Sequence, residues 1–452
     1  MKKRPVDKLI WLMAVSLGMT VFAQPAPLSR PPQTESPGVN GPLARPPQAL
    51  PPNVQQQPPA PAPGQPRPPA PAPGQPRPPA IVHVVNPEEF PNSMITVGRI
   101  RRLPANFTDV ENLCWSSDGK KLLVDRLRRR TYELVLIDVP EHFSDSRMLP
   151  ERIITEGARD SVSLHHGSPC WFPRGGGDYY LFTKQSPSSR DYVSSIPSNG
   201  WYCNLYFGWA GRASVPLTQY LYSPSVPLGV ASPKVSLDGK TLFWCGVNGR
   251  ANDRNLWGKR GLYVAGVEWN QNMPQLVNVR ELGDNRLGTF RESCDISADG
   301  NSVLYCANKN NAPWFAMDVY VRNLKGNTIK CVAEGGMNRW ACFSPKAKKI
   351  IWSSSRGFSI PNMGVAGSRW QKELRTELWL MTADGLDKRR LTFFNQRDSR
   401  DNLFLGLTSQ EHCYVGAVAW HPNGRQVAAV IYFGARKRAT SMVVLIDLSD
   451  RG

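Results

Sequence analysis

The sequence lacks the short motifs that mark most enzyme classes. It contains no G-x-S-x-G elbow, no H-E-x-x-H pair, no P-loop and no dinucleotide-binding G-x-G-x-x-G context. No two cysteines form a C-x-x-C pair, which argues against zinc ribbons and thioredoxin-like chemistry. The glycine run at 175–177 is interpreted as part of a hairpin turn. These absences favour a non-catalytic protein, with no cofactor and no metal predicted.

Long apolar runs are also scarce, and none after the N-terminus is long enough to span a membrane. Basic residues at positions 2–4 precede an apolar run over 10–23, which at about 14 residues is shorter than the roughly 20 that cross a bilayer. Small residues at Val21 and Ala23 suit cleavage before Gln24. Residues 1–23 are therefore predicted to be a secretory signal peptide, the alternative being an uncleaved anchor. This predicts a periplasmic, secreted or cell-envelope location.

Acidic residues are the scarcer charge, with 36 Asp and Glu against 55 Lys and Arg, for a net charge of +19. A basic surface of this kind favours an anionic partner. Nucleic acid suits the charge but not the predicted compartment, so it is not predicted as a partner. The 9 cysteines are an odd number, so at least one thiol is expected to lack a partner within the chain. Two alternatives stay open for the others, buried small apolar side chains or disulfides between blades.

Residues 24–80 are rich in Pro, Gln and Ala, and PAPGQPRPPA at 61–70 recurs identically at 71–80. Such a segment cannot bury a core and is expected to be a disordered, extended polyproline linker. From Ile81 onward the pattern changes to short apolar strands separated by turn residues, without long amphipathic helices. The predicted domains are thus a signal peptide (1–23), a proline-rich linker (24–80) and one all-β domain (81–452).

The all-β region is built from repeats of two strands joined by a tight turn that carries Asp-Gly or its equivalent. Six copies are found, at 113–124, 169–183, 234–245, 294–306, 341–353 and 418–431. A third strand follows each copy, and a fourth is indicated in several of them. Six such units predict a six-bladed β-propeller. The last unit lacks a fourth strand, so the N-terminal strand at 94–104 is predicted to complete it and close the ring.

The segment ELWLMTADGLDKRRLTFFN at 377–395 resembles the repeat of TolB-like propellers. The S-x-D-G-K turns at 116–120 and 236–240 resemble the same WD40-like PD40 repeats. The resemblance covers about residues 94–450 and implies a six-bladed propeller of an exported protein, without implying a function. TolB carries a small α/β domain ahead of its propeller, where this chain has the proline-rich linker. The resemblance therefore does not carry over the partner contacts of that family.

Propellers usually bind at one end of the central channel. The loops between second and third strands reach that end and are basic, with tryptophans interleaved, which would attract an anion and stack against it. This predicted basic loop face comprises Arg128, Arg129, Arg130, Arg254, Trp257, Arg260, Trp314, Arg369, Trp370, Arg436, Lys437 and Arg438. The alternative is that these are ordinary solvated loop residues.

The first residues of the inner strands are expected to lie at the same end of the channel. This predicted channel mouth comprises Glu111, His165, His166, Arg291, Glu292, Arg339, Trp340 and His412. The three histidines with a carboxylate could hold a transition metal, as in propellers of some polysaccharide lyases. They come from only two blades without close ligand spacing, so polar residues lining a wet channel are the preferred interpretation.

The sequence favours an exported, non-catalytic binding scaffold that recognises an envelope protein or an anionic polymer such as an acidic glycan. The propeller is expected to be monomeric and to have no membrane span beyond the signal segment. One alternative is a metal-assisted, lyase-like enzyme acting on glycans. Another is a structural envelope assembly factor whose proline-rich arm makes the contact.

Overall fold

The computed structural model describes one all-β region in the second, larger part of the chain. The described residues are 95–107, 109–128, 131–144, 147–155, 164–175, 177–189, 200–209, 212–220, 228–249, 259–271, 273–283, 287–309, 316–360, 373–433 and 441–450. The predicted signal peptide and linker lie outside them, so these two boundaries stay predictions.

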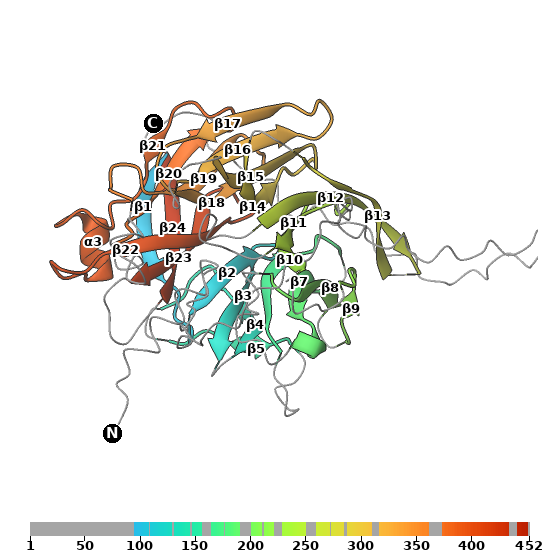
Figure 1. Ribbon diagram of the computed structural model, residues 1–452. Coiled ribbons are helices and arrows are strands. Elements are labelled where there is room, and N and C mark those ends of the chain that lie inside the picture. Colours follow the sequence, from blue (N-terminus) through green and yellow to red (C-terminus); the bar gives the residue numbers. More distant parts are fainter. Residues whose placement is uncertain are drawn as a thin grey trace, which may run out of the picture.

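Six four-stranded antiparallel sheets are arranged around a common centre as the blades of a propeller (Figure 1). Blade 1 consists of β2 (Val110–Trp115), β3 (Lys121–Arg128), β4 (Thr131–Asp138) and β5 (Glu151–Ile153). Blade 2 consists of β6 (His166–Trp171), β7 (Tyr179–Gln185), β8 (Cys203–Trp209) and β9 (Val215–Pro216). Blade 3 consists of β10 (Gly229–Val235), β11 (Thr241–Gly249), β12 (Lys259–Asn270) and β13 (Met273–Glu281).

The remaining three blades follow in chain order. Blade 4 consists of β14 (Leu287–Ile296), β15 (Ser302–Lys309), β16 (Asp318–Asn323) and β17 (Ile329–Ala333). Blade 5 consists of β18 (Asn338–Phe343), β19 (Lys349–Ser354), β20 (Glu377–Thr382) and β21 (Arg389–Arg390). Blade 6 consists of β22 (Cys413–Trp420), β23 (Gln426–Phe433), β24 (Ser441–Asp450) and β1 (Ile95–Arg102). The predicted six-bladed all-β propeller is confirmed.

Blade 6 joins the two ends of the described chain. Strand β1 pairs with β24 in antiparallel register from Ile95 opposite Asp450 to Arg102 opposite Val444. The pairing is reinforced by an ion pair of 3.1 Å between Arg101 and Asp447. The N-terminal strand therefore covers the outer edge that β24 would otherwise expose, as the sequence predicted.

The turn that joins the first and second strands repeats the same hydrogen bonds in three blades. In blade 1, Ser116 Oγ donates to Asp118 Oδ1 at 2.6 Å and accepts from Lys121 N at 2.9 Å. Gly119 completes the turn with a φ of 70°, a conformation that glycine adopts without strain. The same bonds recur in blades 3 and 4. The S-x-D-G sequence is thus the local cause of the hairpin in these three blades.

Each inner strand contains an irregularity at the same place. The register between first and second strands shifts in all six blades a few residues before the turn. Ser168, Ser232 and Trp340 stand at this position with φ of 49° each. A β-bulge of this kind changes which side chains share a face of the strand.

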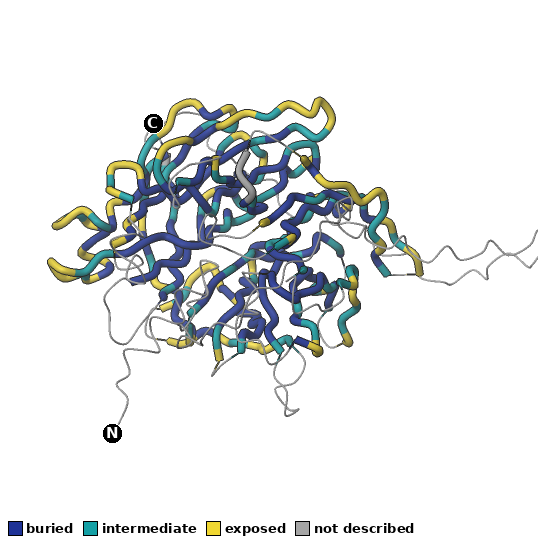
Figure 2. Tube along the Cα trace, viewed as in Figure 1, coloured by how far each residue is buried: buried dark blue, intermediate teal, exposed yellow. Residues whose placement is uncertain are grey.

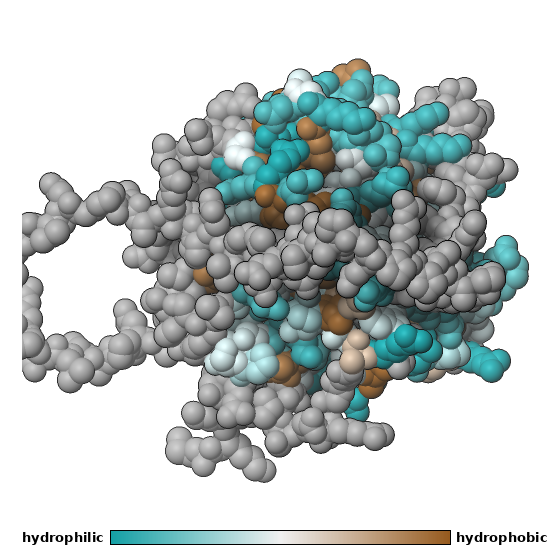
Figure 3. All heavy atoms as spheres, turned by 90° about the vertical axis from the view of Figure 1, so that its right-hand side faces the viewer, coloured by the Kyte–Doolittle hydropathy of each residue, from teal (hydrophilic) through white to brown (hydrophobic). Residues whose placement is uncertain are grey.

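The core lies within and between the blades, where buried apolar side chains of neighbouring sheets meet (Figure 2). Large exposed apolar side chains are scattered, and on the face shown in Figure 3 single hydrophobic residues stand among hydrophilic ones. In the part of the chain that the structure describes, no helix is long and apolar enough to cross a membrane.

Two elements were not predicted from the sequence. Blade 2 has a fourth strand of two residues, β9, and a short helix α3 (Arg400–Leu405) precedes blade 6. All nine cysteines are free, and only Cys331 is exposed. The alternative of disulfides between blades is therefore not what the structure contains, and most of the thiols are small buried groups.

Candidate functional site

The inner strands of the six blades run in the same direction along the central channel. Their first residues lie at one end, the channel mouth, and their last residues lie at the other end beside the S-x-D-G turns, the turn face. All eight residues predicted for the channel mouth are within the described part of the chain. They fall into a basic cluster, an acidic sector and three histidines.

The basic cluster is centred on Glu292 of β14. Its Oε2 accepts from Arg339 of β18 through Nε at 3.0 Å and Nη2 at 2.5 Å. Arg260 of β12 approaches from the other side, with Nη1 3.9 Å from Glu292 Oε1. The three side chains are buried, so two guanidinium groups share a single carboxylate in a medium that screens charge poorly. The cluster carries a net charge of +1.

Aromatic rings hold the two arginines in place. The Arg339 guanidinium lies 4.4 Å from the centre of the Trp340 ring, and that of Arg260 lies 4.9 Å from the centre of the Phe290 ring. Trp340 in turn stacks on Tyr414 with ring centres 6.5 Å apart. The flat guanidinium groups are therefore fixed by packing before any ligand arrives.

The hydrogen-bonding capacity of Arg260 is not used up within the described structure. Its Nε and Nη1 are buried, and neither donates a hydrogen bond. Burial favours the uncharged form of Glu292, but the charges of Arg339 and Arg260 outweigh it and lower the pKa of Glu292. Glu292 is thus ionised and already bound, and Arg260 has donors left for an anion.

Blade 1 contributes the acidic sector of the mouth. Glu111 is buried and accepts from Tyr132 Oη at 2.9 Å. Asp109, just before β2, lies in a left-handed backbone conformation, and burial raises the pKa of its carboxyl to about 6. Glu111 and Asp109 belong to blade 1, whereas the residues of the basic cluster belong to blades 3–5.

The three histidines do not converge on a common point. His165 Nδ1 accepts from the backbone of Tyr132 at 3.2 Å, and His166 Nδ1 contacts the carbonyl of Leu164 at 3.0 Å. Burial lowers the pKa of His165 and His412 to about 4 and that of His166 to about 3, so all three are neutral at pH 7. Within the described ranges, no group of three His, Cys, Asp or Glu side chains could hold a metal ion.

The basic loop face is described at two of its predicted residues. Arg128 ends β3 with an exposed side chain that reaches Glu133 at 3.5 Å. Arg260 is buried and belongs to the cluster around Glu292, so it is a channel-mouth residue and not part of an exposed loop. The others lie outside the described residues, namely Arg129, Arg130, Arg254, Trp257, Trp314, Arg369, Trp370, Arg436, Lys437 and Arg438.

No family model matches this sequence, and no curated protein is similar to it. Solved structures do match. A TolB-type protein from Agrobacterium tumefaciens is 16% identical with a TM-score of 0.40, covering 63% of this chain and 80% of that one. TolB from Acinetobacter baumannii is 12% identical with a TM-score of 0.39, covering 76% and 64%. The six sheets make the chain a six-bladed β-propeller, and these TolB structures are among those that it is similar to.

A third match is a protein of a different kind. Oligogalacturonate lyase from Vibrio parahaemolyticus is 10% identical with a TM-score of 0.40, covering 77% of this chain and 93% of that one. Propellers of different activity are therefore similar to this chain to the same degree. At these identities the matches describe the fold alone, and the function has to be argued from the side chains of the channel.

Proposed function

We propose that this protein is an exported, non-catalytic binding propeller that recognises an anionic or acidic partner of the cell envelope, a protein or a glycan. The partner binds at the channel mouth and the basic loops around it. The observation that carries this proposal is the cluster in which Arg260 and Arg339 share one carboxylate, with Arg260 Nε and Nη1 making no hydrogen bond to any described residue.

A carboxylate, sulfate or phosphate would supply what this cluster lacks. A buried arginine with unused donors is costly, and an incoming anion that accepts from Nε and Nη1 removes that cost. The guanidinium presents its donors in a flat fork that matches a carboxylate. The net charge of +19 adds long-range attraction, so binding is expected to weaken as salt increases.

The proposed compartment and domain organisation support the same function. A secretory signal at 1–23 would export the chain, and the proline-rich linker at 24–80 would hold the propeller at a distance from its point of attachment or assembly. The linker would thereby give the basic mouth access to partners in the envelope.

The test uses defined polyanions and a variant of the loops. Poly-glutamate and polygalacturonate are immobilised beside neutral dextran, and the full-length protein is passed over each surface at several salt concentrations. We expect wild type to bind both polyanions, and charge reversal of Arg128, Arg129, Lys437 and Arg438 to glutamate to weaken binding at least tenfold.

The matched control reverses four exposed basic residues at the turn face, Lys120, Lys240, Lys348 and Arg425. It changes the net charge by the same amount at the opposite end of the propeller, and we expect it to bind nearly as well as wild type. If both variants lose binding equally, attraction is a matter of net charge and the proposed face is wrong. Unchanged binding of the loop variant would also refute it.

A further inference from the structure

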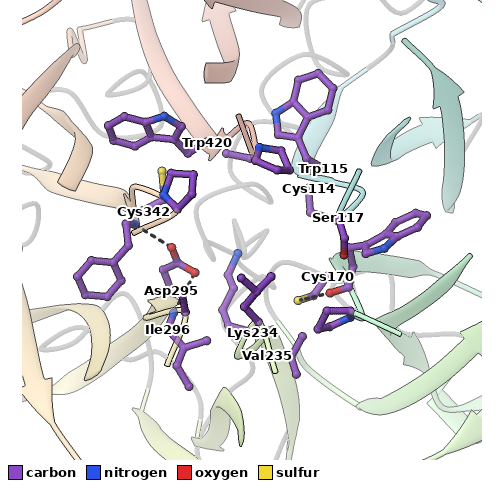
Figure 4. Close-up of a pocket in the computed structure, with 18 of the residues that line it drawn as sticks. Cys114, Trp115, Ser117, Cys170, Lys234, Val235, Asp295, Ile296, Cys342 and Trp420 are labelled. Carbon is purple, nitrogen blue, oxygen red and sulfur yellow. Dashed lines mark hydrogen bonds between the residues drawn. The ribbon is translucent and has the colours of Figure 1, made fainter. Parts of the chain in front are cut away.

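A cavity of about 270 Å³ lies at the turn-face end of the central channel, opposite the channel mouth. All six blades contribute to its wall. One equivalent residue of each inner strand lines the cavity (Figure 4). This residue stands two positions before the one that begins the turn, which is a serine in four of the blades. The six are Cys114, Cys170, Lys234, Asp295, Cys342 and Ala419.

Lys234 is the one basic side chain among the residues that line the cavity, and its ammonium group points toward the centre (Figure 4). No hydrogen bond and no carboxylate within ion-pair distance is found for it among the residues that the structure describes. Burial lowers the pKa of Lys234, but the Cys170 thiol and the Asp295 carboxylate outweigh burial and raise it. Asp295, the one acidic lining residue, is already engaged, since it accepts from Phe343 N at 2.8 Å and from Ile296 N at 2.9 Å. The cavity thus offers unused donors and a carboxylate that is largely satisfied.

Most of the remaining lining is apolar, with Ser116, Ser117 and Ser344 as the polar exceptions. Trp115, Trp171 and Trp420 stand around the ring, and three prolines from the turns, Pro173, Pro345 and Pro422, add flat apolar surface. Burial raises the pKa of Cys114, Cys170 and Cys342, so these thiols stay protonated. A neutral thiol neither competes with a ligand carboxylate for Lys234 nor reacts readily. A few polar groups, here Lys234 and Asp295, within aromatic and aliphatic walls are the usual composition of a small-molecule pocket.

We propose that this cavity binds a small monoanion in which a carboxylate is attached to an apolar or aromatic group. The carboxylate accepts from Lys234, and the apolar group packs between the tryptophans and prolines. The volume is slightly below the roughly 300–1,000 Å³ of pockets for drug-sized ligands, which limits the ligand to about the size of one aromatic amino-acid side chain with its carboxylate. Two sources present this chemistry, a free organic acid and the C-terminal residue of a peptide.

The experiment measures binding of 3-phenylpropionate to the full-length protein by ligand-observed NMR titration. The neutral analogue 3-phenylpropanol has the same apolar body without the charge. A short peptide ending in phenylalanine, as free acid and as amide, tests the second source. We expect the acids to bind and their neutral analogues to bind at least tenfold more weakly.

Two variants separate the anchor from general charge. Lys234→Met keeps the length of the side chain but removes the ammonium, and we expect it to weaken binding of the acid at least tenfold. Lys240→Met removes an exposed lysine from the hairpin of the same blade and should leave binding unchanged. Equal binding of the acid by wild type and Lys234→Met, or no binding of either acid by wild type, would overturn the proposal.

A third variant covers the case in which Lys234→Met does not fold. Ala419→Phe places a ring into the cavity while leaving the ammonium in place, and we expect it to abolish binding of the acid. Binding that survives in Ala419→Phe would place the ligand elsewhere. The variant with four reversed charges in the basic loops should bind 3-phenylpropionate like wild type, so this site and the proposed polyanion site can fail independently.

Discussion

Replacing Glu292 by glutamine tests the electrostatic account of the channel mouth. Glu292 Oε2 accepts from Arg339 at 3.0 and 2.5 Å, and Oε1 lies 3.9 Å from Arg260. Glutamine keeps the size of the side chain but leaves two buried guanidinium groups without a negative charge. Removing one partner of a buried ion pair typically costs about 3–5 kcal/mol, and we expect Glu292→Gln to lower the free energy of unfolding by this amount at pH 7.

The measurement is urea denaturation followed by tryptophan fluorescence. Glu334→Gln is the matched control, because Glu334 also pairs with a basic residue, Lys309 at 3.4 Å, but has a side chain that is 74% exposed. An exposed pair of this kind contributes at most about 1 kcal/mol. If Glu292→Gln costs no more than Glu334→Gln, the buried cluster does not stabilise the fold and the reasoning fails.

The same pair of proteins gives a test with a defined sign in pH. The folded-state pKa of Glu292 is lowered from its ordinary 4.5, because Arg339 and Arg260 outweigh the effect of burial. Its ionised form therefore contributes stability above pH 4.5, and this contribution is lost as the pH falls through the lower folded-state value. The difference between wild type and Glu292→Gln should be largest near neutral pH and should shrink below pH 4.5.

Three further predictions concern other parts of the propeller. A protein that begins at residue 104 lacks β1 and exposes the edge of β24, so it should melt at a lower temperature and form oligomers detectable by light scattering. The control protein, which begins at residue 91 and keeps β1, should show neither effect. Asp109→Asn should stabilise the fold at pH 7 by up to about 3 kcal/mol, because burial raises the pKa of Asp109 from 3.8 to about 6. Urea denaturation should show no gain in the free energy of unfolding below pH 3.8, where the carboxyl is neutral in the folded and the unfolded state. A thiol reagent should label Cys331 first in the native protein, at a rate that rises with pH toward its pKa of about 11, and nine sites after denaturation. Rapid native labelling of cysteines other than Cys331 and the half-buried Cys114 would contradict the burial of those thiols.

Much of the fold could be predicted because its causes are local. The S-x-D-G turns fix the hairpins of three blades through hydrogen bonds between neighbouring residues, and the unmatched strand at 94–104 fits the open edge of blade 6. Strand β9 was missed because it is two residues long and contains a proline. Helix α3 was missed because it is too short for a periodic pattern, although its cap residues Ser399 and Gly406 are typical helix ends.

The site was harder to predict because simple alternation fails along the inner strands. In a regular strand, residues three apart point to opposite faces. In blade 5, however, Cys342 pairs with Ile351 and Arg339 pairs with Ser353, and in blade 4 Asp295 pairs with Leu304 and Glu292 with Cys306. The two partners in each blade are two residues apart on the second strand, so they point to the same face. The two inner-strand residues opposite them therefore also share a face, although they are three residues apart.

The bulge is therefore what brings the chemistry of the channel together. It places Glu292 and Arg339 at the mouth on the same faces of their blades as Asp295 and Cys342 at the turn-face cavity. Its signal in the sequence is weak, because Ser168, Ser232 and Trp340 adopt a positive φ that their residue types rarely show. The inner strands thus present charged groups at both ends of one channel, and both proposed anion sites depend on this one repeated irregularity.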